Sequence, residues 1–292
     1  MKRTACVILA RSLADPQRQT LLLSLCVHAW LQCFVKVDCA GAIRGYNCPM
    51  RRRFFVDQFG DDSATLRGDA AEHLGRVLRA EPGQLYELSD GARVWLARVE
   101  RVSLRKSGDN RVEFALVEPV AAREPPLRIQ LLIALVKFDR FEWCLEKATE
   151  LGVAEIVPLH AARTDKPLLA AANKRLKRWR RILLESAQQS RRLRPPAIRN
   201  VMRVEDAFAQ STAATRIFMS ERRDARPVNE ALRSAKGPSA CLAIGPEGGW
   251  TDDEVSAARA ADFVETSLGE IILRTETAVL ASLAILHFAL ND

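Results

Sequence analysis

The stretch AIGPEGGWTDDEV, residues 243–255, places a glycine-rich turn between a buried strand and the start of a helix. Gly245, Gly248 and Gly249 permit backbone conformations and a close approach of the backbone that larger side chains would block. A strand-to-helix turn of this kind often holds a ligand, because the helix N-terminus presents free N–H groups to it. The stretch therefore predicts either a ligand-binding loop or a tight turn with nothing bound.

A second glycine-bearing loop, LGEIILRTETA, follows about twenty residues later, at residues 268–278. Each loop follows a predicted strand and leads into a predicted helix, and loops at the carboxyl ends of adjacent strands are where α/β sheets bind ligands. The signatures of a P-loop, a dinucleotide-binding turn and a nucleophile elbow are all missing from the sequence. The pair of loops at this spacing therefore indicates one shared ligand site of another kind.

The elements that would position these loops alternate between strand and helix from Arg128 onward, which favours a parallel α/β sheet. Asp139 is a plausible N-cap for the first of the helices, and Gly152 lies just past its end. The predicted strands cover residues 128–136, 154–159, 198–201, 216–220, 240–245 and 263–268. The predicted helices cover residues 139–152, 173–190, 204–210 and 251–261, with a terminal helix from about Thr275.

The chain before a proline-punctuated linker at residues 118–128 has a different character. It contains several short β-rich runs, a hairpin signal at Asp90-Gly91 and one short helix at about residues 69–79. This pattern predicts a small barrel domain over residues 50–120, followed by the α/β domain over residues 126–292. The arginines expected to decorate the barrel are Arg51, Arg52, Arg53, Arg76 and Arg79.

The first 49 residues differ in composition from the rest and are left out of the fold prediction. Their apolar run TLLLSLCVHAWL is too short to span a bilayer. Arginines precede the run and small residues follow it, so a cleaved signal peptide or an arginine-rich organelle leader fits. We favour a third interpretation, in which the natural start is Met50. The alternative of a secreted or membrane-tethered protein rests on residues 1–49 alone.

Composition and charge limit the possible classes of protein. Five of the seven cysteines precede residue 50, and the other two stand in apolar contexts without a zinc-ligand spacing. We therefore expect a reduced, cytoplasmic protein with no metal site. We also expect no membrane span. The formal net charge is +8, but residues 163–203 hold thirteen Lys/Arg against two Asp/Glu. Such a concentration of positive charge is either a solvated helix face or, as we favour, a surface for a polyanion such as nucleic acid.

The motifs IGPEGGWTDDEV and LGEIILRTETA together resemble the two cofactor loops of the SPOUT superfamily of RNA methyltransferases. Within it, the chain looks like the bacterial family that methylates N3 of a uridine in 16S ribosomal RNA. Further matches in chain order are EHLGRVLR, EKATELGV, ARTDKP and QQSRRLRPP, so the resemblance covers residues 50–292. It implies a PUA-like RNA-binding barrel, a parallel-sheet methyltransferase domain with a deep trefoil knot, and a homodimer with shared active sites.

The resemblance also implies that S-adenosylmethionine is the cofactor, held largely by backbone groups of the two loops. Its target would be the 16S rRNA or the small ribosomal subunit. The residues expected to bind the cofactor are Ile244, Gly245, Pro246, Gly248, Gly249, Leu268, Gly269, Ile272, Leu273 and Thr275.

The chemistry of uridine sets the catalytic candidates, because its N3–H is a weak acid and a poor nucleophile at neutral pH. Arg274 and Glu276, just after the second loop, are the leading candidates for polarising the imide and accepting its proton. Glu247 is a second candidate base, and equally a carboxylate that ties its own loop together. The predicted RNA-binding residues are Arg163, Arg192, Arg194, Arg76 and Arg79. Alternatives are a catalytically silent RNA-binding assembly factor and a SPOUT enzyme acting at another RNA position.

Overall fold

The structure is a computed structural model that describes residues 52–105, 108–122, 124–233, 235 and 237–290. The interpretation of residues 1–49 and the position of Arg51 therefore lie outside the described residues. Two sheets account for the described strands, a five-stranded one before the linker and a larger one after it. Among the described helices, none is long and apolar enough to cross a membrane.

The first sheet has the strand order β1-β3-β4-β5-β2 and encloses its own small core, which contains Phe54, Leu74 and Phe114. Its strands are β1 (Arg53–Phe55), β2 (Ser63–Arg67), β3 (Leu85–Ser89), β4 (Val94–Ser103) and β5 (Arg111–Val120), with the short helices α3 (Gly68–Glu72) and η2 (His73–Val77). The predicted hairpin is confirmed between β3 and β4, where the Asp90 carboxylate accepts the backbone N–H groups of the next turn residues. The strand order leaves β1 and β2 as the outer strands.

The second sheet confirms the predicted parallel architecture, because every pair of its strands is parallel. Its order is β11-β13-β10-β12-β6-β7-β8, and β9 also pairs with β7. The predicted strand at 198–201 is two short strands instead, because the chain leaves the sheet between them. The strands are β6 (Arg128–Ala134), β7 (Glu155–His160), β8 (Ala197–Ile198), β9 (Met202–Arg203), β10 (Thr215–Met219), β11 (Arg226–Pro227), β12 (Ser239–Ile244) and β13 (Val264–Ser267).

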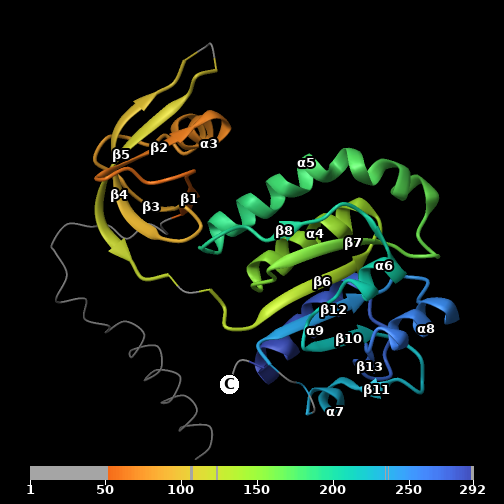
Figure 1. The fold of residues 1–292 in the computed structure, drawn as a ribbon. Coiled ribbons are helices and arrows are strands. Elements are labelled where there is room, and N and C mark those ends of the chain that lie inside the picture. Colours follow the sequence, from red (N-terminus) through yellow and green to blue (C-terminus); the bar gives the residue numbers. More distant parts are fainter. Residues whose placement is uncertain (1–51, 106–107, 123, 234, 236, 291–292) are drawn as a thin grey trace, which may run out of the picture. The chain divides into compact units, whose positions relative to one another are not determined.

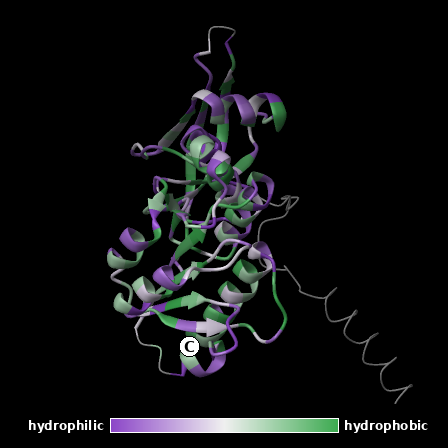
Figure 2. Ribbon diagram, turned by 90° about the vertical axis from the view of Figure 1, so that its right-hand side faces the viewer, coloured by the Kyte–Doolittle hydropathy of each residue, from purple (hydrophilic) through white to green (hydrophobic). Residues whose placement is uncertain are grey.

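Helices cover both faces of this sheet (Figure 1). Along β6, Leu131 and Ile133 pack into one core cluster while Leu132 and Ala134 pack into another, as the two-residue period of a strand requires. The first cluster includes residues of α4 (Phe138–Glu150), α5 (Lys166–Gln189) and α9 (Thr275–Leu290), and the second includes residues of α6 (Val204–Ala209) and α8 (Asp252–Ala260). The short α7 (Val228–Leu232) adds Leu232 to the first. Figure 2 shows the hydrophobic colour along the inner strands, as expected for a sheet buried on both faces.

The helix boundaries agree with the sequence signals at α8 and differ at α4. Gly152, with a φ of 81°, follows α4 as predicted, but the N-cap of α4 is Lys137, which makes no side-chain cap. Asp139 lies one residue inside the helix, where its charge favours the positive end of the helix dipole. At α8, Thr251 and Glu254 form a complete capping box.

Glu254 also joins α8 to the loop that follows β7. Its side chain is buried at 3% exposure, and its Oε1 accepts the Ala162 N–H at 2.8 Å. The other oxygen, Oε2, accepts the Thr251 N–H at 2.8 Å. Because both oxygens accept from backbone N–H groups, a carboxylate satisfies the site and an amide does not.

We therefore expect Glu254→Gln to lower the free energy of unfolding by about 1–3 kcal/mol, since the amide NH2 would face one of the two N–H donors. The neighbouring exposed Asp253→Asn is the matched control and should change stability little. Urea unfolding followed by circular dichroism measures both. Equal midpoints for the two variants would contradict a structural role of the Glu254 carboxylate.

Candidate active site

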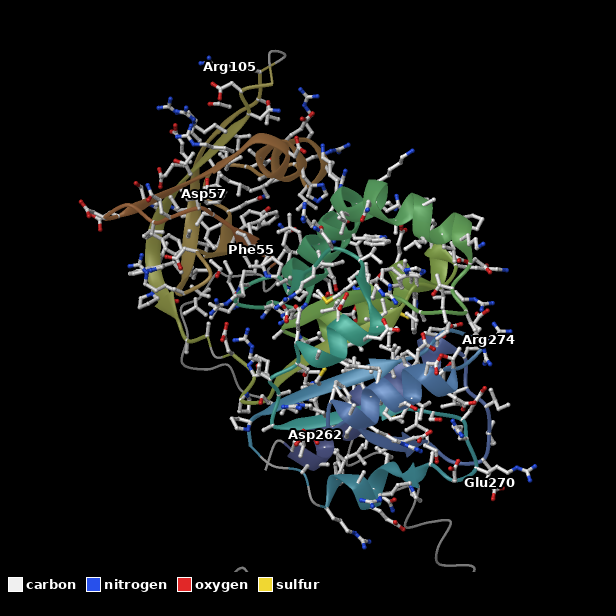
Figure 3. The ribbon with its side chains drawn as sticks, turned by 45° about the vertical axis from the view of Figure 1, so that its right-hand side comes forward. Phe55, Asp57, Arg105, Asp262, Glu270 and Arg274 are labelled. Carbon is white, nitrogen blue, oxygen red and sulfur yellow. The ribbon has the colours of Figure 1, made fainter. Side chains whose placement is uncertain are left out.

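A cavity of about 650 Å³ opens at the carboxyl ends of the parallel strands. Its walls come from the segments that follow five adjacent strands in the sheet: β13, β10, β12, β6 and β7. Figure 3 shows two of its residues, Glu270 and Arg274, at one edge of the α/β domain, away from Asp262, which precedes β13. The position agrees with the general rule for ligand sites in α/β sheets.

The two predicted loops line the same cavity, although the second begins more than twenty residues after the first. Nine of the ten residues predicted to bind cofactor are in the lining: Ile244, Gly245, Pro246, Gly249, Leu268, Gly269, Ile272, Leu273 and Thr275. The exception is Gly248. The arrangement thus brings the two loops into one site, as their spacing predicted.

The glycines of the first loop are required for different reasons. Gly249 has a φ of 71°, and a Cβ there would lie 2.9 Å from Glu221 Oε1. At Gly245 a Cβ would lie 2.9 Å from the Trp250 ring. At Gly248, which has no positive φ, it would lie 3.2 Å from the Arg163 side chain. Gly245 and Gly249, rather than Gly248, are therefore the positions where small size shapes the cavity.

A third wall, Met219 to Arg222, follows β10 and was not predicted from the sequence. The Trp250 indole N–H donates to the Met219 carbonyl at 2.8 Å, which joins this wall to the first loop. A signal for it existed, because β10 was a predicted strand of the same parallel sheet. The sequence gives no strand order, however, and β10 reaches the site because it lies between β12 and β13.

The charged groups at the mouth of the cavity include Arg274, Glu247 and Arg140. Arg274 is exposed, and Glu247 pairs with Arg140, a residue of α4 that the sequence did not single out. Glu276 does not line the cavity; its Oε1 lies 3.8 Å from Arg140 Nε. The three predicted catalytic residues are thus split, with Arg274 and Glu247 facing the cavity and Glu276 reaching it through Arg140.

Much of the basic segment at residues 163–203 is neutralised by carboxylates, most of which lie elsewhere in the sequence. The partners are Glu142 for Arg175 and Arg178, Glu185 for Arg181, Glu124 for Arg194, Glu155 for Arg199 and Glu205 for Arg203. Within the described part of the chain, Lys166, Lys174, Lys177 and Arg180 are exposed and make no ion pair, so they carry the uncompensated charge of α5.

The predicted RNA-binding arginines occupy different environments. Arg163 lines the cavity and donates to the Gly248 carbonyl. Arg76 is exposed and paired with Glu72, and Arg79 is exposed with a φ of 52°. Arg194 is exposed and paired with Glu124.

Arg192, the fifth of the predicted RNA-binding arginines, contacts the end of α4. Its guanidinium donates to the Thr149 carbonyl at 2.9 Å and to the Val153 carbonyl at 2.6 Å, at and just beyond the C-terminal end of α4. Burial lowers the pKa of Arg192 to about 10. A cation at this position satisfies carbonyls that the helix leaves open, so the structure gives Arg192 a structural role. Counting charges along the sequence could not show that the Nη1 group of Arg192 donates to main-chain carbonyls.

Comparison with known proteins supports the expectation drawn from the two loops. The RNA methyltransferase domain family matches residues 123–287. The relative from Synechocystis, a ribosomal RNA small subunit methyltransferase E, is 34% identical over 81% of this chain and 76% of its own. The protein of that name from Bacillus subtilis is 30% identical over 81% of this chain and 96% of its own.

A solved structure agrees with these relatives. The ribosomal RNA small subunit methyltransferase E of Neisseria gonorrhoeae, bound to S-adenosyl methionine, superposes with a TM-score of 0.70. It is 31% identical and covers 82% of this chain and 97% of its own.

We expect Arg192→Ala to lower the free energy of unfolding by about 1.5–3 kcal/mol, because two carbonyls lose a charged donor. The matched control is Arg194→Ala, whose exposed ion pair should contribute less than about 1 kcal/mol. Thermal unfolding of both variants tests the difference. A loss for Arg194→Ala as large as that for Arg192→Ala would contradict it.

Proposed function

The chain belongs to the RNA methyltransferase family, and on that premise we propose that it transfers a methyl group from S-adenosylmethionine to N3 of a uridine in 16S ribosomal RNA of the small ribosomal subunit. The observation that carries the proposal is the cavity itself. Two glycine-bearing loops share it, and its charged lining residues include Glu247, Arg140 and Arg274. The gonococcal relative holds S-adenosyl methionine.

The cavity fits this cofactor. A volume of about 650 Å³ suits a ligand of nucleoside size. Leu268, Leu273 and the 75% exposed Ile272 provide an apolar wall for an adenine ring, and Gly245 and Gly249 leave the backbone open to it. We propose that Ile244, Pro246, Gly269 and Thr275 complete the binding site, with main-chain N–H groups supplying the polar contacts.

The residues at the mouth fit the requirements of the reaction. When bound, the cofactor supplies an electrophilic methyl group on a positively charged sulfur. Glu247 accepts the N3 proton, and Arg274 stabilises the negative charge that spreads over the uracil carbonyl oxygens. As N3 forms its bond to the methyl carbon, the S–CH3 bond breaks and its electron pair stays with sulfur. Glu276 then has a supporting role through Arg140.

We infer that RNA reaches the mouth along exposed cations. Arg163 stands in the cavity wall, and Arg194, Arg76 and Arg79 are exposed elsewhere. Lys174, Lys177 and Arg180 add unpaired charge on α5, where phosphates would release bound counterions. The target uridine must leave its stack to present N3 to the cavity.

Membership of the RNA methyltransferase family also suggests an oligomeric state and the type of each domain. We propose a cytoplasmic homodimer with a PUA-like first domain and a trefoil knot in the second. Support for the dimer comes from apolar exposure on two helices that contribute to one core cluster: Phe288 of α9 is 88% exposed and Trp143 of α4 is 41% exposed. Sedimentation velocity measures the oligomeric state directly.

The experiment that tests the function compares modified nucleosides in small-subunit rRNA after incubation with the protein and labelled S-adenosylmethionine. We expect one labelled N3-methyluridine in the 16S rRNA. A different methylated nucleoside would overturn the uridine-N3 assignment. Cofactor binding without any transfer to rRNA or subunits would favour the RNA-binding assembly factor.

We expect Gly249→Ala to weaken S-adenosylmethionine binding at least tenfold, because its backbone is held at a φ of 71°, which disfavours any residue with a Cβ. Gly248→Ala is the matched control, since Gly248 has no positive φ and its new methyl group would lie 3.2 Å from the Arg163 side chain. Isothermal titration calorimetry measures both. Equal losses of affinity in the two variants would refute the proposed difference between Gly249 and Gly248.

We expect Glu247→Gln and Arg274→Ala to retain cofactor affinity within a fewfold and to lose about 100-fold or more in turnover. Raising the pH should partly restore Glu247→Gln, because solvent then generates the imide anion without a protein base. Single-turnover methylation over a range of pH provides the readout. Turnover equal to that of the parent protein would remove Glu247 from the proton-transfer role.

A further inference from the structure

We propose that Arg140 is a positioning residue that fastens the two cofactor loops to each other and orients Glu247 at the mouth of the cavity. This inference rests on the function proposed above. Arg140 belongs to neither loop and lies in the first turn of α4, directly after the segment that leaves β6.

Two carboxylates from different loops meet at this one guanidinium. Arg140 Nη1 pairs with Oε1 of Glu247, which belongs to the loop after β12. Arg140 Nε lies 3.8 Å from Oε1 of Glu276, which lies in the first turn of α9 just after the second loop. A single side chain on a third element therefore connects both halves of the cavity.

Arg140, Glu247 and Glu276 differ in how far their side chains are exposed to solvent. The exposed fractions of the side chains are 27% for Arg140, 45% for Glu247 and 19% for Glu276. Glu276 Oε2 is buried and has no hydrogen-bond partner among the described residues. Glu276 therefore depends on Arg140 for its counter-charge, while Glu247 remains open to a ligand.

The other groups around Glu276 do not replace Arg140. Burial first, and then the charge of Glu276, raise the pKa of the Cys144 thiol to about 12. Cys144 is fully buried in α4, and its thiol stays protonated and neutral at physiological pH. Arg163 and Arg274 also line the cavity, but neither forms an ion pair with Glu276 or Glu247 in the described structure.

An arginine suits this position because its planar fork offers several donors in fixed directions, so it can serve two carboxylates at once. A lysine supplies a point charge and cannot hold both in the same geometry. Without a cation, the Glu247 and Glu276 carboxylates would remain close together with no counter-charge between them, and their repulsion would separate the loops. The expected consequences are weaker cofactor binding and a misplaced Glu247.

The test uses Arg140→Met and Arg140→Lys in the full chain, with Glu142→Gln as the matched control. Glu142 lies on the same helix and pairs with Arg175 and Arg178 of α5, and it does not line the cavity. We expect Arg140→Met to weaken S-adenosylmethionine binding at least fivefold and Arg140→Lys to weaken it less. Glu142→Gln should leave the affinity unchanged. Parent-like affinity in both Arg140 variants would overturn the proposal, and this arm requires no methyl transfer.

The second arm asks whether Arg140 acts through Glu247. In the parent background, Arg140→Met should lower the single-turnover rate at saturating cofactor at least tenfold. In the Glu247→Gln background the same change should lower it less than threefold, because interacting residues are not additive. Equal losses in the two backgrounds would overturn the role in orienting Glu247.

The two proposals fail in different ways. If the parent protein transfers no methyl group to rRNA, the proposed function fails, and cofactor affinity alone then decides the fastening role of Arg140. If Arg140→Met does not fold, as judged by circular dichroism, Arg140→Lys decides it. An affinity of Arg140→Lys between that of the parent and one-tenth of it supports the proposal, and an affinity equal to the parent's overturns it.

Discussion

The strand order at the centre of the parallel sheet determines which parts of the chain meet. β6 pairs with β12 on one side and with β7 on the other. The helix after β6, α4, packs on one face of the sheet, and the helix after β12, α8, packs on the opposite face. Two adjacent parallel strands whose helices depart to opposite faces leave a crevice at their carboxyl ends. Arg140 follows one of these strands and Glu247 the other, so their meeting is a consequence of topology.

A crevice formed in this way is made of loops, and loops need contacts that fix their conformation. The first loop obtains them from three directions: Trp250 covers Gly245 and donates to the Met219 carbonyl, Arg163 donates to the Gly248 carbonyl, and Arg140 pairs with Glu247. Arg163 is itself held, because its neighbour Ala162 donates to the buried Glu254. The capping box of α8 thus stabilises a helix and, through one further hydrogen bond, a wall of the cavity.

The sequence predicted the parts of the site that depend on local pattern. The parallel sheet, the hairpin at Asp90 and the two glycine loops follow from periodicity and turn chemistry, and the structure confirms them. It did not predict Arg140 or the wall at Met219, because both reach the cavity through the order of strands in space. It also could not separate Gly248 from Gly249, since their difference lies in backbone angle and in which side chain stands opposite.

The distribution of charge is the clearest example of a feature that the sequence alone does not predict. An ionic interaction depends on distance in space and not on separation in sequence. Residues 163–203 form a basic segment when read alone, yet Glu142, Glu155 and Glu124 approach it from other elements. The Nη1 group of Arg192 donates to two main-chain carbonyls. Among the described residues of α5, the charge available to a polyanion is the part left unpaired, namely Lys166, Lys174, Lys177 and Arg180. Since each phosphate contact contributes about one unit to the salt dependence of binding, that dependence should follow the unpaired cations rather than the total in the segment.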